Sequence, residues 1–316
     1  MDQRNVTRIT TIHLLGFQIP QSITFLVFFL LLMMYCVTIC GNLLIITLVS
    51  YSKTLQSPMY FFLSQLAATD ILLATDILPN MIHTVLVKQT IMSLSVCLTQ
   101  YYFCVIAESS ESLLLTVMSW DRYLAICRPL HYSLKINFQV CWTLAILCWI
   151  LGIFVVLIYM STISNLQFCG PNIIDHFFCD FVPILQLSCS DNSTIQLEAT
   201  IFGFILVIFP FFLIFVSYSY IIVTILKIPS ITGRQKVFST CSSHLTVVSI
   251  YYGTLVCVYL APSSGQTQTL NKLLSLLYTV VNPMMNPIIY SLRNKELKKV
   301  VRKFIIDFLR ICFSRD

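Results

Sequence analysis

The residues most able to do chemistry lie along one apolar stretch, between residues 95 and 127. Polar and apolar side chains there recur in steps of three or four residues: Cys104, Glu108, Glu111, Leu115, Met118 and Arg122. In a helix this spacing puts all of them on one face. Ionisable groups inside a membrane span are costly, so the face must point into a helix bundle and is a functional hypothesis by default.

Two carboxylates are candidates for an ion or proton network. Asp70 belongs to the preceding apolar stretch and is a plausible neighbour of Glu111. Two close carboxylates cannot both stay ionised cheaply, so the pair could share a proton or a cation such as sodium. The alternative is a protonated, hydrogen-bonded packing network. Apart from that sodium ion, the sequence indicates no metal and no cofactor.

An acid and an arginine stand side by side at the end of the same stretch, in Asp121-Arg122-Tyr123. Such a pair at a membrane boundary can act as a switchable ion pair, because breaking it frees the arginine for a partner. The tripeptide alone is weak evidence for such a switch. Its position at the end of the third apolar span makes the evidence strong.

A second candidate switch lies in the last apolar stretch, where Pro283, Asn286 and Pro287 interrupt the helical hydrogen-bond ladder. A helix broken in this way can adopt two arrangements, which a switch requires. Tyr290 follows Asn286 by one turn, so we expect it to face the interior too.

The composition indicates a membrane protein. Of the 316 residues, 57% are hydrophobic and only 10% are charged, and the mean hydropathy is +0.85; soluble domains are about a quarter charged. A helix crosses a bilayer with about 20 apolar residues, and in lipid each span must be helical. Seven such stretches lie near residues 23–49, 58–84, 95–127, 140–163, 197–226, 237–260 and 271–291.

The basic residues predict the orientation of these spans. Fifteen of the 19 Lys and Arg residues fall on the side of the C-terminal tail, and the other four are Arg4, Arg8, Lys88 and Lys272. Positive residues favour the cytosol, so we expect a cytosolic tail and an extracellular N-terminus. The net charge of +6 then reflects topology and contact with lipid headgroups, and a nucleic-acid partner is not indicated.

The predicted fold is an all-α membrane protein with seven transmembrane helices and a short amphipathic cytosolic helix. Residues 1–22 form an extracellular N-terminus, 23–291 the seven-helix domain, and 292–316 the cytosolic helix and tail. Asn5 heads a glycosylation sequon on the outer side, and Asn192 heads a less certain one. The tail alternates apolar and basic residues at helical spacing, which is typical of a helix lying on the inner leaflet. Cys312 lies in the same tail and is expected to be either a palmitoylation site or an ordinary free thiol.

Several long motifs in the expected order resemble one family. They are LQSPMYFFLS at 55–64, MSWDRYLAIC at 118–127, KVFSTCSSHL at 236–245 and PMMNPIIY at 283–290, together with Gly41, Asn42 and Asp70. The chain resembles rhodopsin-like G-protein-coupled receptors, and within them the odorant (olfactory) receptors, over nearly its whole length. Trp120 is a mild departure, because the family usually has tyrosine or a similar residue before the aspartate.

The resemblance implies several residue roles. Cys97 would pair with Cys179, and Cys169 with Cys189, on the oxidising outer side. Arg122, Tyr218 and Tyr290 match the family's cytosolic switch positions, and Tyr252 matches the replacement for the tryptophan toggle of other receptors. With Asp121, Asn286 and Pro287 these complete the expected activation switch.

The resemblance also implies a ligand pocket between the third, fifth, sixth and seventh spans. The matching positions are Cys104, Val105, Glu108, Ser109, Ser112, Phe202, Leu206, Leu255, Val256, Tyr259 and Thr279. A mostly apolar lining suits a small volatile odorant. Glu108 is atypical of the family at this position. One hypothesis is that it anchors an amine or a hydroxyl-bearing odorant; the alternative is that it only bonds to neighbouring helices.

The expected function is olfaction and sensory transduction in the plasma membrane, as a multi-pass glycoprotein and not an enzyme. Its partners would be the odorant, the lipid membrane and a heterotrimeric G protein with the stimulatory, olfactory-type alpha subunit, which raises cyclic AMP. A transporter should show repeats or a polar lumen, and an intramembrane enzyme a nucleophile–base pair or a metal spacing such as H-E-x-x-H; neither is visible. A receptor of the same fold expressed outside the nose remains a rival.

Overall fold

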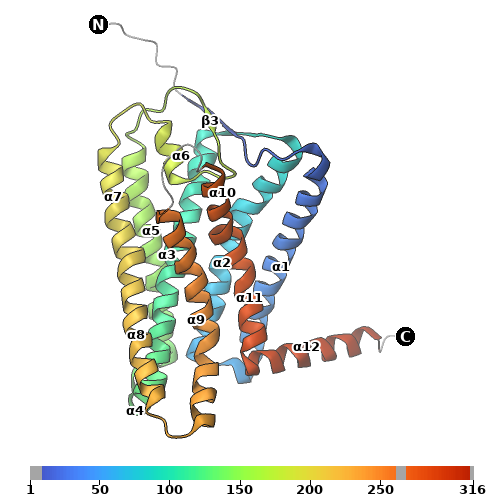
Figure 1. Ribbon diagram of the computed structural model, residues 1–316, viewed down its shortest axis with the longest axis vertical. Coiled ribbons are helices and arrows are strands. Elements are labelled where there is room, and N and C mark those ends of the chain that lie inside the picture. Colours follow the sequence, from blue (N-terminus) through green and yellow to red (C-terminus); the bar gives the residue numbers. More distant parts are fainter. Residues whose placement is uncertain (1–8, 261–267, 314–316) are drawn as a thin grey trace.

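A computed structural model describes residues 9–260 and 268–313 of the chain. Seven long helical segments run side by side as a bundle (Figure 1). The first four are α1 (Thr24–Tyr51), α2 (Pro58–Val87), α3 (Leu94–Cys127) and α5 (Phe138–Ile163). The fifth comprises α7 (Ser193–Gly203), a π-helical turn (Phe204–Ile208) and α8 (Phe209–Leu226); the sixth is α9 (Ile231–Leu260). The seventh comprises α10 (Gln268–Leu276), a π-helical turn (Leu277–Val281) and α11 (Asn282–Arg293).

These segments match the seven predicted spans, with ends that differ by a few residues. Within the described residues, five helical segments are long and apolar enough to cross a membrane by composition. The two others are α3 and α9, which have more polar residues than their neighbours. The position of α3 explains its polarity, because α3 contacts α2, α5, α8 and α9 and is enclosed by them.

The lipid-facing surface is carried mainly by α1, α5 and α8. Phe25 and Leu26 of α1 are about 70% exposed, and Phe154 of α5 and Phe215 of α8 are also well exposed. In water such a surface would be unfavourable, since each apolar side chain left exposed forgoes the free energy of burial. A bilayer removes this cost, which agrees with a protein that spans it.

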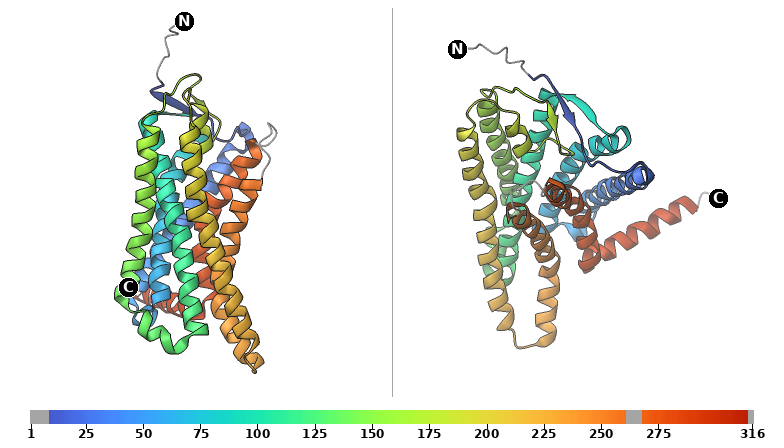
Figure 2. Two further views of the ribbon diagram at one scale, coloured as in Figure 1. Left: turned by 90° about the vertical axis from the view of Figure 1, so that its left-hand side faces the viewer. Right: turned by 45° about the horizontal axis from the view of Figure 1, so that its top comes forward.

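One end of the bundle, here named the N-terminal pole, is covered by a small sheet (Figure 2). Strand β1 (Thr11–Leu14) lies between β2 (Thr90–Ser93) and β3 (Ile173–Ile174), antiparallel to β2 and parallel to β3. The sheet joins three segments far apart in the sequence. Its strands are at most four residues long, too short for the amino-acid sequence to predict them.

Two disulfides hold the long loop at the N-terminal pole. Cys97 at the start of α3 is bonded to Cys179, with Cα atoms 5.5 Å apart, and Cys169 is bonded to Cys189, at 5.8 Å. The loop also contains the short helix α6 (Phe181–Gln186), capped by Asp180. These bonds fix the loop as a lid over the bundle.

The opposite end, the C-terminal pole, carries α4 (Pro129–Lys135) and α12 (Lys295–Phe313). In Figure 1, α12 leaves the end of α11 and runs away from the bundle, roughly across its axis. Leu297 of α12 is fully buried against the bundle. The predicted sequon residue Asn5 lies outside the described residues, and so does the side chain of Cys312.

Candidate functional site

A cavity of about 260 Å³ lies inside the bundle beneath the lid. Its wall is formed by α3, α5, α6, α7, α9 and the two π-helical turns. The lining residues are Tyr101, Val105, Glu108, Ser109, Val155, Tyr159, Asp180, Phe181, Val182, Ala199, Phe202, Gly203, Leu206, Val207, Tyr251, Leu255 and Tyr278. The wall is mostly apolar, with two carboxylates and several tyrosines.

Six of the residues expected in a ligand pocket lie on this wall. They are Val105, Glu108, Ser109, Phe202, Leu206 and Leu255. Helical spacing accounts for this grouping, since Val105, Glu108 and Ser109 share one face of α3. The cavity therefore brings together residues that come from three separate spans.

The other expected pocket residues lie elsewhere. Cys104 is buried beside the cavity and its thiol donates to Oε1 of Glu108 at 3.5 Å. Thr279 is fully buried and donates to the carbonyl of Ser275. Val256 is half exposed in a groove between α8 and α9, so its expected place in this cavity is wrong: it follows Leu255 by one residue, a turn of about 100° around the helix. The side chain of Tyr259 lies outside the described residues.

Several lining residues are not among those expected from the sequence. Tyr101 precedes Val105 by four residues and Glu108 by seven, so extending the same helical face would have found it. Asp180 and Phe181 come from the lid, next to the disulfide of Cys179. Nothing in the local sequence indicates how far a loop reaches into a bundle.

Two tyrosines of α9 are bonded to α3 at the floor of the cavity. The hydroxyl of Tyr251 donates to the carbonyl of Glu108 at 3.2 Å. Ser112 donates to the carbonyl of Leu206 at 2.6 Å, and its oxygen lies 3.0 Å from the hydroxyl of Tyr252. Leu206 lies in a π-helical turn, where the helical hydrogen-bond pattern is shifted. Ser112 thus joins three helical segments directly below the cavity.

Further down the bundle, the two network carboxylates are held by asparagines. Nδ2 of Asn286 donates to both oxygens of Asp70, at 3.0 and 3.1 Å, and Nδ2 of Asn282 donates to Glu111 at 2.9 Å. All four side chains are buried. Within the described part of the chain, the amide oxygens of both asparagines have no hydrogen-bond partner. Two buried amide oxygens of the cluster therefore lack a donor among the described residues.

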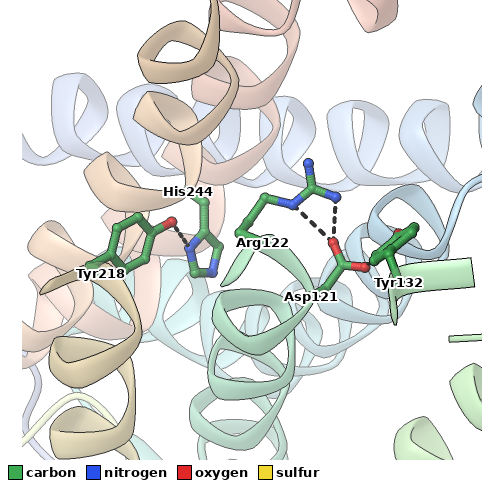
Figure 3. Close-up of polar contacts among 5 residues, drawn as sticks. All are labelled: Asp121, Arg122, Tyr132, Tyr218 and His244. Carbon is green, nitrogen blue, oxygen red and sulfur yellow. Dashed lines mark hydrogen bonds and ion pairs between the residues drawn. The ribbon is translucent and has the colours of Figure 1, made fainter. Parts of the chain in front are cut away.

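The residues of the expected activation switch are spread along the bundle: Tyr252 lies at the cavity floor and Asn286 binds Asp70, whereas Asp121, Arg122 and Tyr218 lie at the C-terminal pole (Figure 3). Arg122 is bonded to Asp121 through its Nε at 2.9 Å and through an Nη atom, and Tyr132 of α4 donates to the other oxygen of Asp121 at 2.9 Å. Burial and the neighbouring Asp121 raise the pKa of Tyr132, so its hydroxyl stays protonated and can donate. The carboxylate of Asp121 is fully buried, and Arg122 and Tyr132 supply its hydrogen bonds.

Beside this ion pair, Tyr218 of α8 is hydrogen-bonded to His244 of α9, with 2.6 Å between Oη and Nδ1. The two rings are stacked, with centroids 5.7 Å apart. Tyr290 of α11 is fully buried, and Pro287 packs closely against Gly41 of α1. Arg122, Tyr218, His244 and Tyr290 therefore come from four helices that pack together toward this pole, α3, α8, α9 and α11, while the cavity lies near the other pole.

Comparison with known proteins agrees with this geometry. The family model described as olfactory receptor matches residues 31–308. Human olfactory receptor 10A7 is 45% identical over 95% of each chain, and mouse olfactory receptor 5P55 is 44% identical over 97% of this chain and 99% of its own. The crystal structure of squid rhodopsin has the same fold, with a TM-score of 0.73 at 18% identity, covering 94% of this chain and 89% of that one.

Members of this family are multi-pass proteins of the plasma membrane that act as receptors and not as enzymes. The long helices, the lid disulfides at the N-terminal pole and the sequence motifs toward the C-terminal pole occur here in one chain. The chain therefore belongs to the olfactory receptor family of seven-helix, G-protein-coupled receptors.

Proposed function

We propose that this receptor binds a small, mostly apolar volatile molecule in the cavity between α3, α5, α7 and α9. The observation that carries the proposal is the cavity itself, which lies within the bundle, is lined mainly by apolar and aromatic side chains, and offers a few polar anchors. Concave, mostly apolar sites with few polar groups are typical of small-molecule pockets. Ligands of this size make few contacts, so we expect modest affinity for a single odorant.

We further propose that the N-terminal pole faces the outside and that the C-terminal pole faces the cytosol. The excess of Lys and Arg on the side of the tail supports this orientation. The two disulfides at the N-terminal pole support it too, because disulfides persist in oxidising compartments. The switch at Arg122 would then face the G protein.

The mechanism that we propose is a population shift between two packings of the bundle. Only contacts that differ between the two packings can move the equilibrium. A ligand in the cavity touches Tyr251 and Leu206, and both are joined to α3 through hydrogen bonds at the cavity floor. Loosening these bonds lets the cytosolic end of α9 move outward and separates Tyr218 from His244.

At the cytosolic pole this movement would open a groove next to α3. Arg122 would leave Asp121, and the C-terminal helix of a G-protein alpha subunit would enter the groove, a helix-in-groove mode of recognition. We propose that the alpha subunit is the stimulatory, olfactory type, so that activation raises cyclic AMP.

The carboxylates Asp70 and Glu111 would hold a shared proton or a sodium ion in the inactive packing. The amide oxygens of Asn282 and Asn286, which accept no hydrogen bond from any described residue, support this part of the proposal, since sodium binds oxygen ligands. Sodium would favour the packing in which these four side chains lie together. A rearrangement of α11 at Pro287 would disperse them.

The test is cyclic AMP in cells that carry the receptor and an olfactory-type G protein. The cells are exposed to a panel of amines, alcohols, aldehydes, acids, esters and thiols. A saturable response that Arg122→Ala abolishes at equal surface density supports the proposal. Silence toward the whole panel, with the receptor verified at the surface and other alpha subunits also supplied, contradicts it.

A further inference from the structure

The cavity wall carries two carboxylates and no basic side chain. Glu108 enters from α3 and Asp180 from the lid, and no lining residue in the described part of the chain is Lys, Arg or His. The two carboxylates line the same cavity from opposite elements, the bundle and the lid. Two acids without a counter-charge in one largely apolar cavity are electrostatically unfavourable, and a cation would relieve this.

Each carboxylate has an oxygen to spare for a ligand. Oε1 of Glu108 accepts from the thiol of Cys104 at 3.5 Å, and Oδ1 of Asp180 accepts from the backbone N–H of Phe181 at 2.7 Å. Among the described residues, Oε2 of Glu108 and Oδ2 of Asp180 accept no hydrogen bond. Because both side chains line the cavity, these oxygens are available to a donor inside it.

Two basic residues near the lid, Lys272 and His176, do not neutralise the cavity. Lys272 of α10 is paired with Asp175 and also donates to the carbonyl of Gly16, so its charge is already engaged. Burial lowers the pKa of His176, whose ring is therefore neutral at physiological pH. Neither residue is part of the cavity wall.

Aromatic rings surround the same space. Tyr101, Tyr159 and Phe181 form a triangle with ring centroids 6.0, 6.2 and 6.2 Å apart, and Phe202 packs on Tyr159 at 5.5 Å. These rings pack against one another, and all four residues line the cavity. Aromatic faces attract organic cations, so an aromatic wall is a second feature of the cavity, independent of the carboxylates, that favours a cation.

We propose that this cavity takes a protonated alkylamine, with its ammonium group between Glu108 and Asp180. The N–H groups donate to the two spare carboxylate oxygens, and the alkyl body lies against the apolar part of the wall at Val155 and Leu206. The proposal rests on the proposed function and specifies its ligand class. Glu108 fixes the amine from the bundle, and Asp180 closes the site from the lid.

The test is a series of primary amines of about four to eight carbons, including isopentylamine and cyclohexylamine, each paired with the alcohol of the same skeleton. Concentration–response curves for cyclic AMP are recorded for the wild type, Glu108→Gln and Asp180→Asn at matched surface density. Both replacements keep size and shape, and asparagine can still cap α6. Glu198→Gln is the matched control, because Glu198 bonds to Thr162 and does not line the cavity.

We expect amines to activate at concentrations at least about tenfold below their alcohols, since hydrogen bonds to charged groups are the stronger ones. Glu108→Gln and Asp180→Asn should each raise the half-maximal concentration for amines by about tenfold or more and change that for alcohols far less. Glu198→Gln should leave the amine curve unchanged.

Three results overturn the proposal. One is a receptor that responds to alcohols or other neutral odorants and to no amine; the proposed function then stands. The second is an equal shift of amines and alcohols in both variants, which makes the carboxylates structural. The third is a shift in only one of the two variants, which removes the two-carboxylate site. Silence toward every class of odorant is a different outcome, because it contradicts the proposed function and the amine proposal falls with it.

Discussion

Removing the hydroxyl of Tyr252 should raise the basal activity of the receptor. In the packing described here, Arg122 is bound to Asp121 and α9 is held to α3 beneath the cavity. Ser112 gives its only hydrogen to the carbonyl of Leu206, so it accepts from Tyr252. Tyr252→Phe removes this bond and leaves the ring in place against Phe211.

The magnitude follows from the type of bond that is lost. A neutral hydrogen bond contributes about 0.5–1.5 kcal/mol, and the replacement leaves no buried donor without an acceptor, because the hydroxyl itself is gone. The equilibrium between the two packings should shift by about two- to twelvefold, since 1.4 kcal/mol is a factor of ten. Where the active packing is a small minority, basal cyclic AMP rises by nearly the same factor.

The assay is basal cyclic AMP per surface receptor, without added odorant. Tyr51→Phe serves as the control, because Tyr51 is 85% exposed at the end of α1. Ser112→Ala should raise basal activity further, since it also deprives the carbonyl of Leu206 of its donor. The double variant should match Ser112→Ala, because the two changes remove one shared bond. Unchanged or lower basal activity in Tyr252→Phe would refute the reasoning.

Two further predictions concern the lid. Burial lowers the pKa of His176 in the folded receptor. Below about pH 6.5 the unfolded chain binds a proton at this residue more readily than the folded receptor does, so the free energy of unfolding falls as the pH falls. The melting temperature of the purified receptor should fall more between pH 7 and pH 5 in the wild type than in His176→Gln; equal losses would contradict this. Gln100 donates to the carbonyl of Asp76 and accepts from the N–H of Cys179, so Gln100→Leu orphans a buried N–H and should cost about 1–3 kcal/mol. An unchanged melting temperature would show that the link is not stabilising.

The sequence predicts the spans well because each is a long apolar run, and hydropathy is a local property. The ends differ by a few residues where polar turns continue a helix, as at Ile231 of α9. The π-helical turns at Phe204–Ile208 and Leu277–Val281 were not predicted, since one extra residue in a turn leaves the hydropathy unchanged. They nevertheless decide which side chains face the cavity.

The candidate site was predictable where one helix carries several of its residues. Glu108 and Arg122 lie on one face of α3, so their spacing alone pointed to the bundle interior. Val256 was assigned to the cavity by resemblance, but an error of one residue on a helix turns a side chain to another face. Asp180 depends on how the lid folds back, and this depends on bonds between distant segments such as Cys97 and Cys179.

The central claim is that a ligand in the cavity controls the switch at the opposite pole. The most direct test is the agonist concentration–response of Val105→Trp, with Arg122→Ala measured beside it at matched surface density. Val105 lines the cavity and lies far from the switch, so a tryptophan there fills the site without touching Arg122. The account predicts that Val105→Trp loses the agonist response but keeps its basal cyclic AMP, and that Arg122→Ala loses both. An agonist curve for Val105→Trp that overlays that of the wild type would contradict the account.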